Sequence, residues 1–165
     1  MATYTCKLAL TASAAETLSS ADAPSAASPT IINHSAYDIA ESLTASTTVP
    51  VTDALYLSKA LVAGAGTIDL TALTNTLGDA VDGTTKKLRF CRFTAPTTNT
   101  GAITVDAAAT NGYAVFGTAG KVVISPGQSV AFFLEGDGVT ISATVKDIRL
   151  AGTGAETLNV TLWIG

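Results

Sequence analysis

His34 is the one histidine of this chain and the first residue to consider as a catalytic base. Such a base activates a nearby hydroxyl or thiol, and the sequence contains no Gly-x-Ser-x-Gly turn that would present a serine to it. His34 lies in Asn33-His34-Ser35 beside an expected strand, so we interpret it as a surface or hydrogen-bonding residue. The acidic residues are scattered, mostly in turns, and no two pair as the acids of a glycosidase must. We expect no catalytic residue and no enzyme activity.

The sequence also shows no pattern typical of a metal or cofactor site. One histidine and two cysteines far apart in the sequence do not give the ligand spacing of a zinc site. Two acidic stretches were tested as calcium ligands, Asp79-Ala80-Val81-Asp82-Gly83 and Glu135-Gly136-Asp137-Gly138. Neither matches the helix-loop-helix calcium pattern, and Asp-Gly pairs are common in tight turns. We interpret both stretches as turns and expect no metal and no cofactor.

The two cysteines, Cys6 and Cys91, each fall inside an expected strand. A disulfide framework normally has more cysteines at closer spacing. We therefore interpret both as small buried hydrophobic residues. A single bridge is the alternative if their strands are neighbours.

Aromatic side chains are the remaining candidates for a binding role. Trp163 and Tyr113 could form a sugar-binding platform, as on many β-sandwich modules. Trp163 lies opposite the apolar face of its strand, so we expect it to be exposed or buried by a neighbouring subunit. A single tryptophan is more often a packing or interface anchor. The candidate interface residues are Trp163, Tyr113 and, in the first strand, Tyr4.

Composition points to a protein that makes contacts. The chain has 165 residues, which suits one domain with a sizeable core. Charged residues are only 13%, about half the usual share. The surface must then be largely neutral and rich in hydroxyl groups, which favours close contact with other protein surfaces.

The charge pattern and the apolar runs bear on the partner. A net charge of -4 argues against nucleic acid, which needs a basic patch. In the basic cluster, alternation places Lys87 and Arg89 on the opposite face of the strand from Arg92. We therefore interpret the cluster as a solvated strand edge and not as a phosphate site. No run approaches the roughly 20 apolar residues that cross a bilayer, and no secretory signal is expected. We expect synthesis in the cytoplasm and no membrane contact.

The elements that position these residues are short strands. Period-two alternation and turn formers predict strands at 4–11, 30–35, 37–44, 55–63, 67–70, 86–95, 102–106 and 113–116. Residues 55–63 also fit a helical face, but Tyr56, Val62 and the Gly64-Ala65-Gly66 stop favour a strand. Within residues 86–95, strict alternation places Leu88 on the face of Phe90 and Arg92. Residues 71–85 are expected to be irregular.

The C-terminal segment 121–165 organises the rest of the predicted fold. Four strands, at 121–125, 129–135, 139–145 and 157–164, are separated by turns at 126–128 and 136–138 and by a link that carries Ile148 and Leu150 and ends in a turn at 152–154. We predict that they form an antiparallel meander.

The whole pattern predicts an all-β fold. Eight to ten short strands at spacings of roughly 8 to 12 residues are typical of a β-sandwich. We expect a single-domain antiparallel β-sandwich over residues 1–165, jelly-roll-like, with an extended N-terminal segment. Residues 12–29, rich in alanine and serine, are expected to form a loop or arm that orders on a partner.

A resemblance sharpens the function. It rests on Thr67-Ile68-Asp69-Leu70-Thr71-Ala72-Leu73, Asp79-Ala80-Val81-Asp82-Gly83-Thr84, residues 86–93 and residues 148–165, which resemble small structural proteins of tailed bacteriophages. The predicted architecture is similar to that of phage capsid decoration, or cement, proteins, whose jelly-roll subunits sit on the outer capsid as trimers. These motifs are structural turns, so no functional residue is carried over.

Two functions of different classes follow. The resemblance implies a non-enzymatic virion structural protein on the capsid surface, with the major capsid protein and its own copies, as a homotrimer, as partners. The alternative is a tail-fibre, receptor-binding or carbohydrate-binding β-sandwich module.

Overall fold

Strands dominate this chain because apolar and polar residues alternate along most of it, which suits a sheet with one buried face. The structure is a computed structural model that describes residues 5–18, 30–47, 49–75, 78–134 and 138–165. Of residues 8, 10–18 and 30–42 it describes the backbone alone. Within these ranges there are twelve strands and no helix.

The strands are β1 (Cys6–Leu18), β2 (Thr30–Leu43), β3 (Asp53–Ala60), β4 (Ala65–Asp69), β5 (Leu73–Thr74), β6 (Ala80–Val81), β7 (Leu88–Thr94), β8 (Ile103–Ala107), β9 (Lys121–Ile124), β10 (Ser129–Phe133), β11 (Asp147–Ala151) and β12 (Thr157–Ile164).

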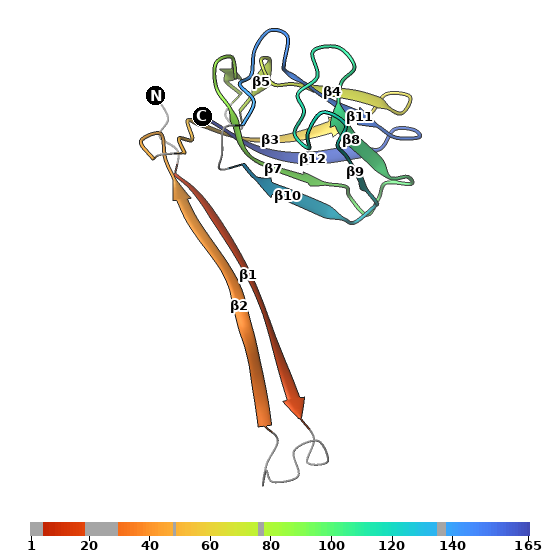
Figure 1. Cartoon of the computed structure of the whole chain (residues 1–165). Helices are drawn as coiled ribbons and strands as arrows, with labels where there is room; N and C mark the ends of the chain where they lie inside the picture. Colours follow the sequence, from red (N-terminus) through yellow and green to blue (C-terminus); the bar gives the residue numbers. More distant parts are fainter. Residues whose placement is uncertain (1–4, 19–29, 48, 76–77, 135–137) are drawn as a thin grey trace. The chain divides into compact units, whose positions relative to one another are not determined.

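Two four-stranded antiparallel sheets pack face to face, with strand orders β10-β7-β12-β3 and β4-β11-β8-β9 (Figure 1). Four of the pairings are nested: β8 with β9, β7 with β10, β4 with β11, and β3 with β12. One long hairpin rolled into two sheets gives this nesting, which is the jelly-roll arrangement. The all-β antiparallel sandwich expected from the sequence is confirmed.

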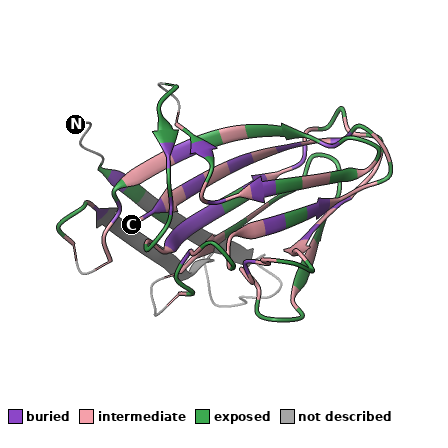
Figure 2. Cartoon of the chain, turned by 90° about the horizontal axis from the view of Figure 1, so that it is seen from above, coloured by how far each residue is buried: buried purple, intermediate pink, exposed green. Residues whose placement is uncertain are grey.

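The main core lies between the two sheets. Strand β12 shows its basis: Leu158, Val160, Leu162 and Ile164 are fully buried, and the residues between them are not. Figure 2 shows buried residues alternating with more exposed ones along the sandwich strands. This alternation is the signal that the sequence displayed.

The predicted meander at 121–165 is wrong. Strands β9 and β11 belong to one sheet, and β10 and β12 belong to the other. The expected turn at Pro126-Gly127 is present, with Gly127 at φ 80° and the Gln128 amide donating to the Ser125 carbonyl at 2.9 Å. This turn carries the chain from β9 in one sheet to β10 in the other. The prediction failed because alternation identifies which face of a strand is buried but not which strand lies beside it.

Three segments differ from their predicted conformation. Residues 139–145 form isolated bridges and turns, in which the Ser142 hydroxyl accepts the Thr144 amide, a local bond that competes with strand pairing. The expected link at Ile148 and Leu150 is instead β11, an inner strand. Residues 113–116 form a turn and an extended stretch outside the named strands, because Tyr113 is held by hydrogen bonds to loops.

A β-bulge in β7 reverses one predicted face. Trp163 pairs with Phe90, but the next residue, Ile164, pairs with Leu88, so Arg89 is the extra residue. Leu88 therefore enters the main core and does not share a face with Phe90 and Arg92, as strict alternation predicted.

Strands β1 and β2 form a two-stranded sheet and run antiparallel (Figure 1). The chain divides into two compact units, one comprising residues up to Cys6 and Leu43–Gly165, the other Lys7–Ser42. Residues 12–18 of the expected loop or arm belong to β1, and residues 19–29 lie outside the described part. The pairing of β1 with β2 is made by backbone amide and carbonyl groups, so it does not require large apolar side chains.

Candidate interaction surface

The outer face of sheet β10-β7-β12-β3 carries the features that fit a binding surface. Strand register orders it in three rows across the four strands. The rows are Ser129, Thr94, Asn159 and Ser58; Ala131, Arg92, Thr161 and Tyr56; and Phe133, Phe90, Trp163 and Ala54. Two rows are thus hydroxyl-rich and one is apolar.

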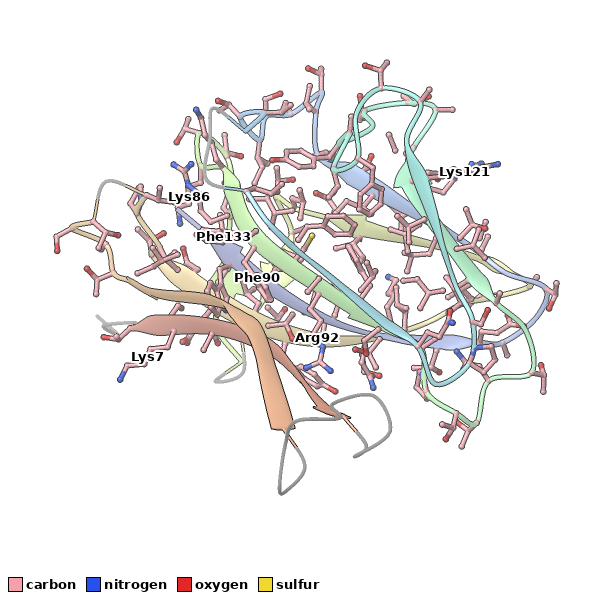
Figure 3. The ribbon with its side chains drawn as sticks, turned by 60° about the horizontal axis from the view of Figure 1, so that its bottom comes forward. Lys7, Lys86, Phe90, Arg92, Lys121 and Phe133 are labelled. Atoms are coloured by element: carbon pink, nitrogen blue, oxygen red, sulfur yellow. The ribbon has the colours of Figure 1, made fainter. Side chains whose placement is uncertain are left out.

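The apolar row is covered by the chain's own residues. The Phe90 and Trp163 ring centroids are 4.5 Å apart. Figure 3 shows Phe90 and Phe133 on neighbouring strands. Three residues of this row, Ala54, Phe133 and Trp163, pack with Cys6, Leu43 and Val51, all buried, in a second core. Cys6 is the first residue of β1 and Leu43 the last of β2, and both belong to the unit that contains the sandwich.

The two polar rows remain open. Tyr56 is 55% exposed, and Arg92 is exposed two strands away, with Thr161 of β12 between them. A hollow of about 150 Å³ lies here, lined by Tyr56, Arg92, Thr94, Asn159 and Thr161. An aromatic ring, a guanidinium, an amide and two hydroxyls offer hydrogen bonds and contact area, with no group that could act as a base.

A second, larger cleft of about 370 Å³ runs between the edge strands β3 and β4. Tyr56 borders this cleft too, and Asp69 lies on its other side. Burial raises the pKa of Asp69, but hydrogen bonds from Lys146 and Thr71 outweigh it, and the pKa is lowered. Asp69 is thereby fixed as a charged, internally paired group.

The candidate interface residues from the sequence fall in three different places. Tyr113 is 2% exposed in the main core, where its hydroxyl donates to the Val139 carbonyl at 2.8 Å and accepts the Leu88 amide at 3.3 Å. Its ring is therefore not accessible to a partner, because the chain itself surrounds it. Trp163 is half-buried in the second core by the chain's own residues, an arrangement that differs from both expected alternatives. Tyr4 lies outside the described residues.

Tyr56 and Arg92 are the residues that the sequence did not single out for binding. Tyr56 served only to favour a strand, and Arg92 was grouped with the basic cluster. The sequence signal that could have identified this site is the alternation along β3 and β12. It places Tyr56 and Thr161 on the outer faces of their strands, and the pairing of β3 with β12 then brings them opposite each other.

Both cysteines are buried and free, as expected. Cys91 lies in the main core and Cys6 in the second core, so no bridge joins them. Burial raises the pKa of the Cys91 thiol to about 12 and also raises that of Cys6. Both thiols act as apolar packing groups.

The acids of the described residues serve turns and ion pairs. Asp82 accepts the Thr84 amide and hydroxyl at 2.8 and 2.6 Å, which agrees with the turn interpretation. Glu156 is buried and accepts from the Thr153 hydroxyl and the Gly154 amide, and these bonds lower its pKa. No three metal-ligating side chains come together in the part of the chain described. The second acidic stretch, at 135–137, lies outside it, and of His34 the backbone alone is described.

Comparison with known proteins identifies no family for this chain. No family model matches the chain, and no curated protein does. One solved structure, from work on Bacillus endospore appendages described as "a novel family of disulfide-linked pili", is similar at 17% identity with a TM-score of 0.41. It covers 68% of this chain and 82% of its own. No helix long and apolar enough to span a bilayer occurs among the described residues.

Proposed function

We propose that this protein is a non-enzymatic structural protein of a tailed-bacteriophage virion, a capsid decoration protein that binds the outer capsid and stabilises contacts between major capsid protein subunits. The observation that supports it is the β1–β2 hairpin, which is a compact unit separate from the jelly roll. The resemblance at residues 67–73 and 148–165 supplies the class of assembly.

The hairpin favours a role in assembly because of its own energetics. A two-stranded hairpin in water is at best marginally stable. Its 13- and 14-residue strands pair on one side only, so each has a row of backbone amide and carbonyl groups unused by the sheet. Binding to a neighbouring subunit would satisfy these groups and bury the strands.

The sandwich contributes a second surface of the same kind. Its outer face carries two rows in which neutral hydroxyl and amide groups predominate, and these groups lose little on desolvation compared with charges. A specific interface buries about 1,600 Å² in total, which a hairpin and one sheet face together can supply. Repetition over a symmetric shell multiplies the effect of each contact.

The carbohydrate-binding alternative had Trp163 as its platform. Trp163 packs against Phe90 within the second core, which leaves that alternative without the residue that supported it. The capsid-decoration proposal is therefore favoured over a carbohydrate-binding module.

Excision of the hairpin tests the proposal. Residues 8–41 are replaced by a short Gly-Ser linker, which keeps Cys6 and Leu43 and hence the second core. Truncation before Pro29 would be less clean, because it also removes Cys6. We expect the excised variant to remain folded by circular dichroism and to lose binding to undecorated capsids of the encoding phage, with Val123→Ala as a surface control. Absence of the full chain from purified particles by mass spectrometry would refute the proposal.

A further inference from the structure

Each sheet of the sandwich carries one arginine on the outer face of an inner strand. Arg149 on β11 lies directly opposite Asp106 on β8, and its Nε donates to the Asp106 carboxylate at 2.7 Å. Arg92 on β7 lies opposite Thr161 on β12 and Ala131 on β10. Arg149 is thus neutralised by its strand neighbour, whereas the strand neighbours of Arg92 carry no charge.

Arg92 has no carboxylate partner among the described residues. Its polar contact is the Ser129 hydroxyl at 3.5 Å, which is long for a hydrogen bond. Ser129 in turn shares a 2.8 Å hydrogen bond with the Thr94 hydroxyl. The guanidinium therefore keeps most of its five donors for other acceptors.

Two lysines of the sandwich, unlike Arg92, are paired with carboxylates. Lys86 pairs with Asp53 at 2.7 Å, and Lys146 pairs with Asp69. Asp53 and Asp69 are thus engaged by lysines, whereas Arg92 faces the hollow of about 150 Å³ that it lines with Tyr56, Thr94, Asn159 and Thr161. Figure 3 shows Arg92 on β7, further along the strand than Phe90.

We propose that Arg92 and the hollow beside it bind the side-chain carboxylate of an aspartate or glutamate presented by a partner protein. A planar guanidinium matches a carboxylate through two parallel hydrogen bonds, and such charged bonds are about twice as strong as neutral ones. Thr94, Thr161 and Asn159 can donate to the remaining carboxylate lone pairs.

A protein partner fits better than a small free anion for two reasons. The hollow is open and lies within two rows of predominantly neutral side chains, which can be covered without stranding further charges. Its rim consists of Tyr56 and Arg92, and tyrosine and arginine are the side chains enriched at the centres of protein interfaces. This inference rests on the proposed function and names the chemistry of the partner surface.

Titration of the isotope-labelled full chain tests the site without any particle. The probe is N-acetyl-glutamate N-methylamide, and the matched probe is the glutamine analogue, which has the same shape without the charge. We expect saturable amide shifts at Thr94, Asn159 and Thr161 with the glutamate probe, and binding about tenfold weaker with the glutamine probe.

Variants locate the effect. Arg92→Gln should abolish the glutamate-dependent shifts, Arg92→Lys should retain part of the affinity, and Arg149→Gln should leave it unchanged because that guanidinium is already paired. Equal shifts with both probes, or unchanged binding by Arg92→Gln, would overturn the inference. Tighter binding of methyl glucuronide than of the glutamate probe would replace it with a glycan site. Glutamate binding without any particle association would sink the proposed function and leave this site in place.

Discussion

Phe90 on β7 and Trp163 on β12 face each other across neighbouring strands, with ring centroids 4.5 Å apart and planes inclined at 34°. They lie on the side of the sheet away from the main core. The sheet β10-β7-β12-β3 is therefore buried on both faces at one end, between the sandwich core and the second core.

The second core should contribute measurably to stability. Phe90→Ala removes a ring that is 7% exposed and that packs on Trp163 of the second core, and we expect the free energy of unfolding to fall by about 3 kcal/mol. Tyr56→Ala, an aromatic truncation on the same face at 55% exposure, should change it by about 0.5 kcal/mol or less. Chemical denaturation measures both. Equal losses for the two variants would contradict a second core.

The hydroxyl of Tyr113 should tie the loop at Val139 to the start of β7. Tyr113→Phe removes the donor to the part-buried Val139 carbonyl and the acceptor of the Leu88 amide, which leaves the buried Leu88 amide without this partner. We expect a loss of about 1–3 kcal/mol in unfolding free energy. Tyr56→Phe is the matched control and should be neutral. Hydrogen exchange at the Leu88 amide should quicken in the Tyr113→Phe variant alone.

Acid should destabilise the protein through carboxylates with lowered pKa values. Hydrogen bonds from Arg149 lower the pKa of Asp106, and hydrogen bonds from Thr153 and Gly154 lower that of Glu156. Because the folded values lie below the ordinary 3.8 and 4.5, the unfolded chain binds more protons in this range. Stability is fully present above the ordinary values and decreases as the pH falls through the folded ones.

Glu156→Gln tests the acid effect. Its melting temperature should fall less steeply than that of the wild type between about pH 5 and pH 2, and Thr153→Val should give an intermediate slope. Thermal melts at half-unit pH intervals measure the slopes. Parallel curves for all three proteins would show that Glu156 plays no part.

The thiols should react in a fixed order. Reaction needs the thiolate, and the pKa of Cys91 is raised to about 12, so iodoacetamide at pH 8 should modify Cys91 only when the sandwich unfolds. Cys6 lies in the smaller second core and should react first. Peptide mapping by mass spectrometry follows both sites. Labelling of Cys91 before Cys6 would contradict the placement of the two cores.

The sequence displays which face of a strand is buried and leaves open which strand lies beside it. β12 was predicted with the correct faces, since Leu158 to Ile164 alternate without interruption. The meander failed because jelly-roll neighbours are distant in the sequence. The bulge at Arg89 moved Leu88 to the other face, and a bulge has no composition signal when the extra residue is not glycine.

For the candidate site too, the sequence indicates the faces of the strands but not which strands are neighbours. The pairing of Tyr56 with Thr161 and of Thr161 with Arg92 depends on three strands from different parts of the chain. No local pattern announces it. Trp163 was correctly placed off the core face, but the residues that cover it, Cys6, Leu43 and Val51, come from segments whose path only the fold reveals.

Nested pairing also bears on the order in which the chain assembles. Among the four nested pairs, β8–β9 closes the shortest loop, whereas the Thr52 hydroxyl reaches the Ile164 carbonyl 112 positions away. Loop-closure entropy favours zipping from the inside outward, with slow completion at the outermost pair. Trp163 arrives with that last pair, so the second core, which joins it to Cys6, Leu43 and Val51, is completed only after the rest of the sandwich has formed.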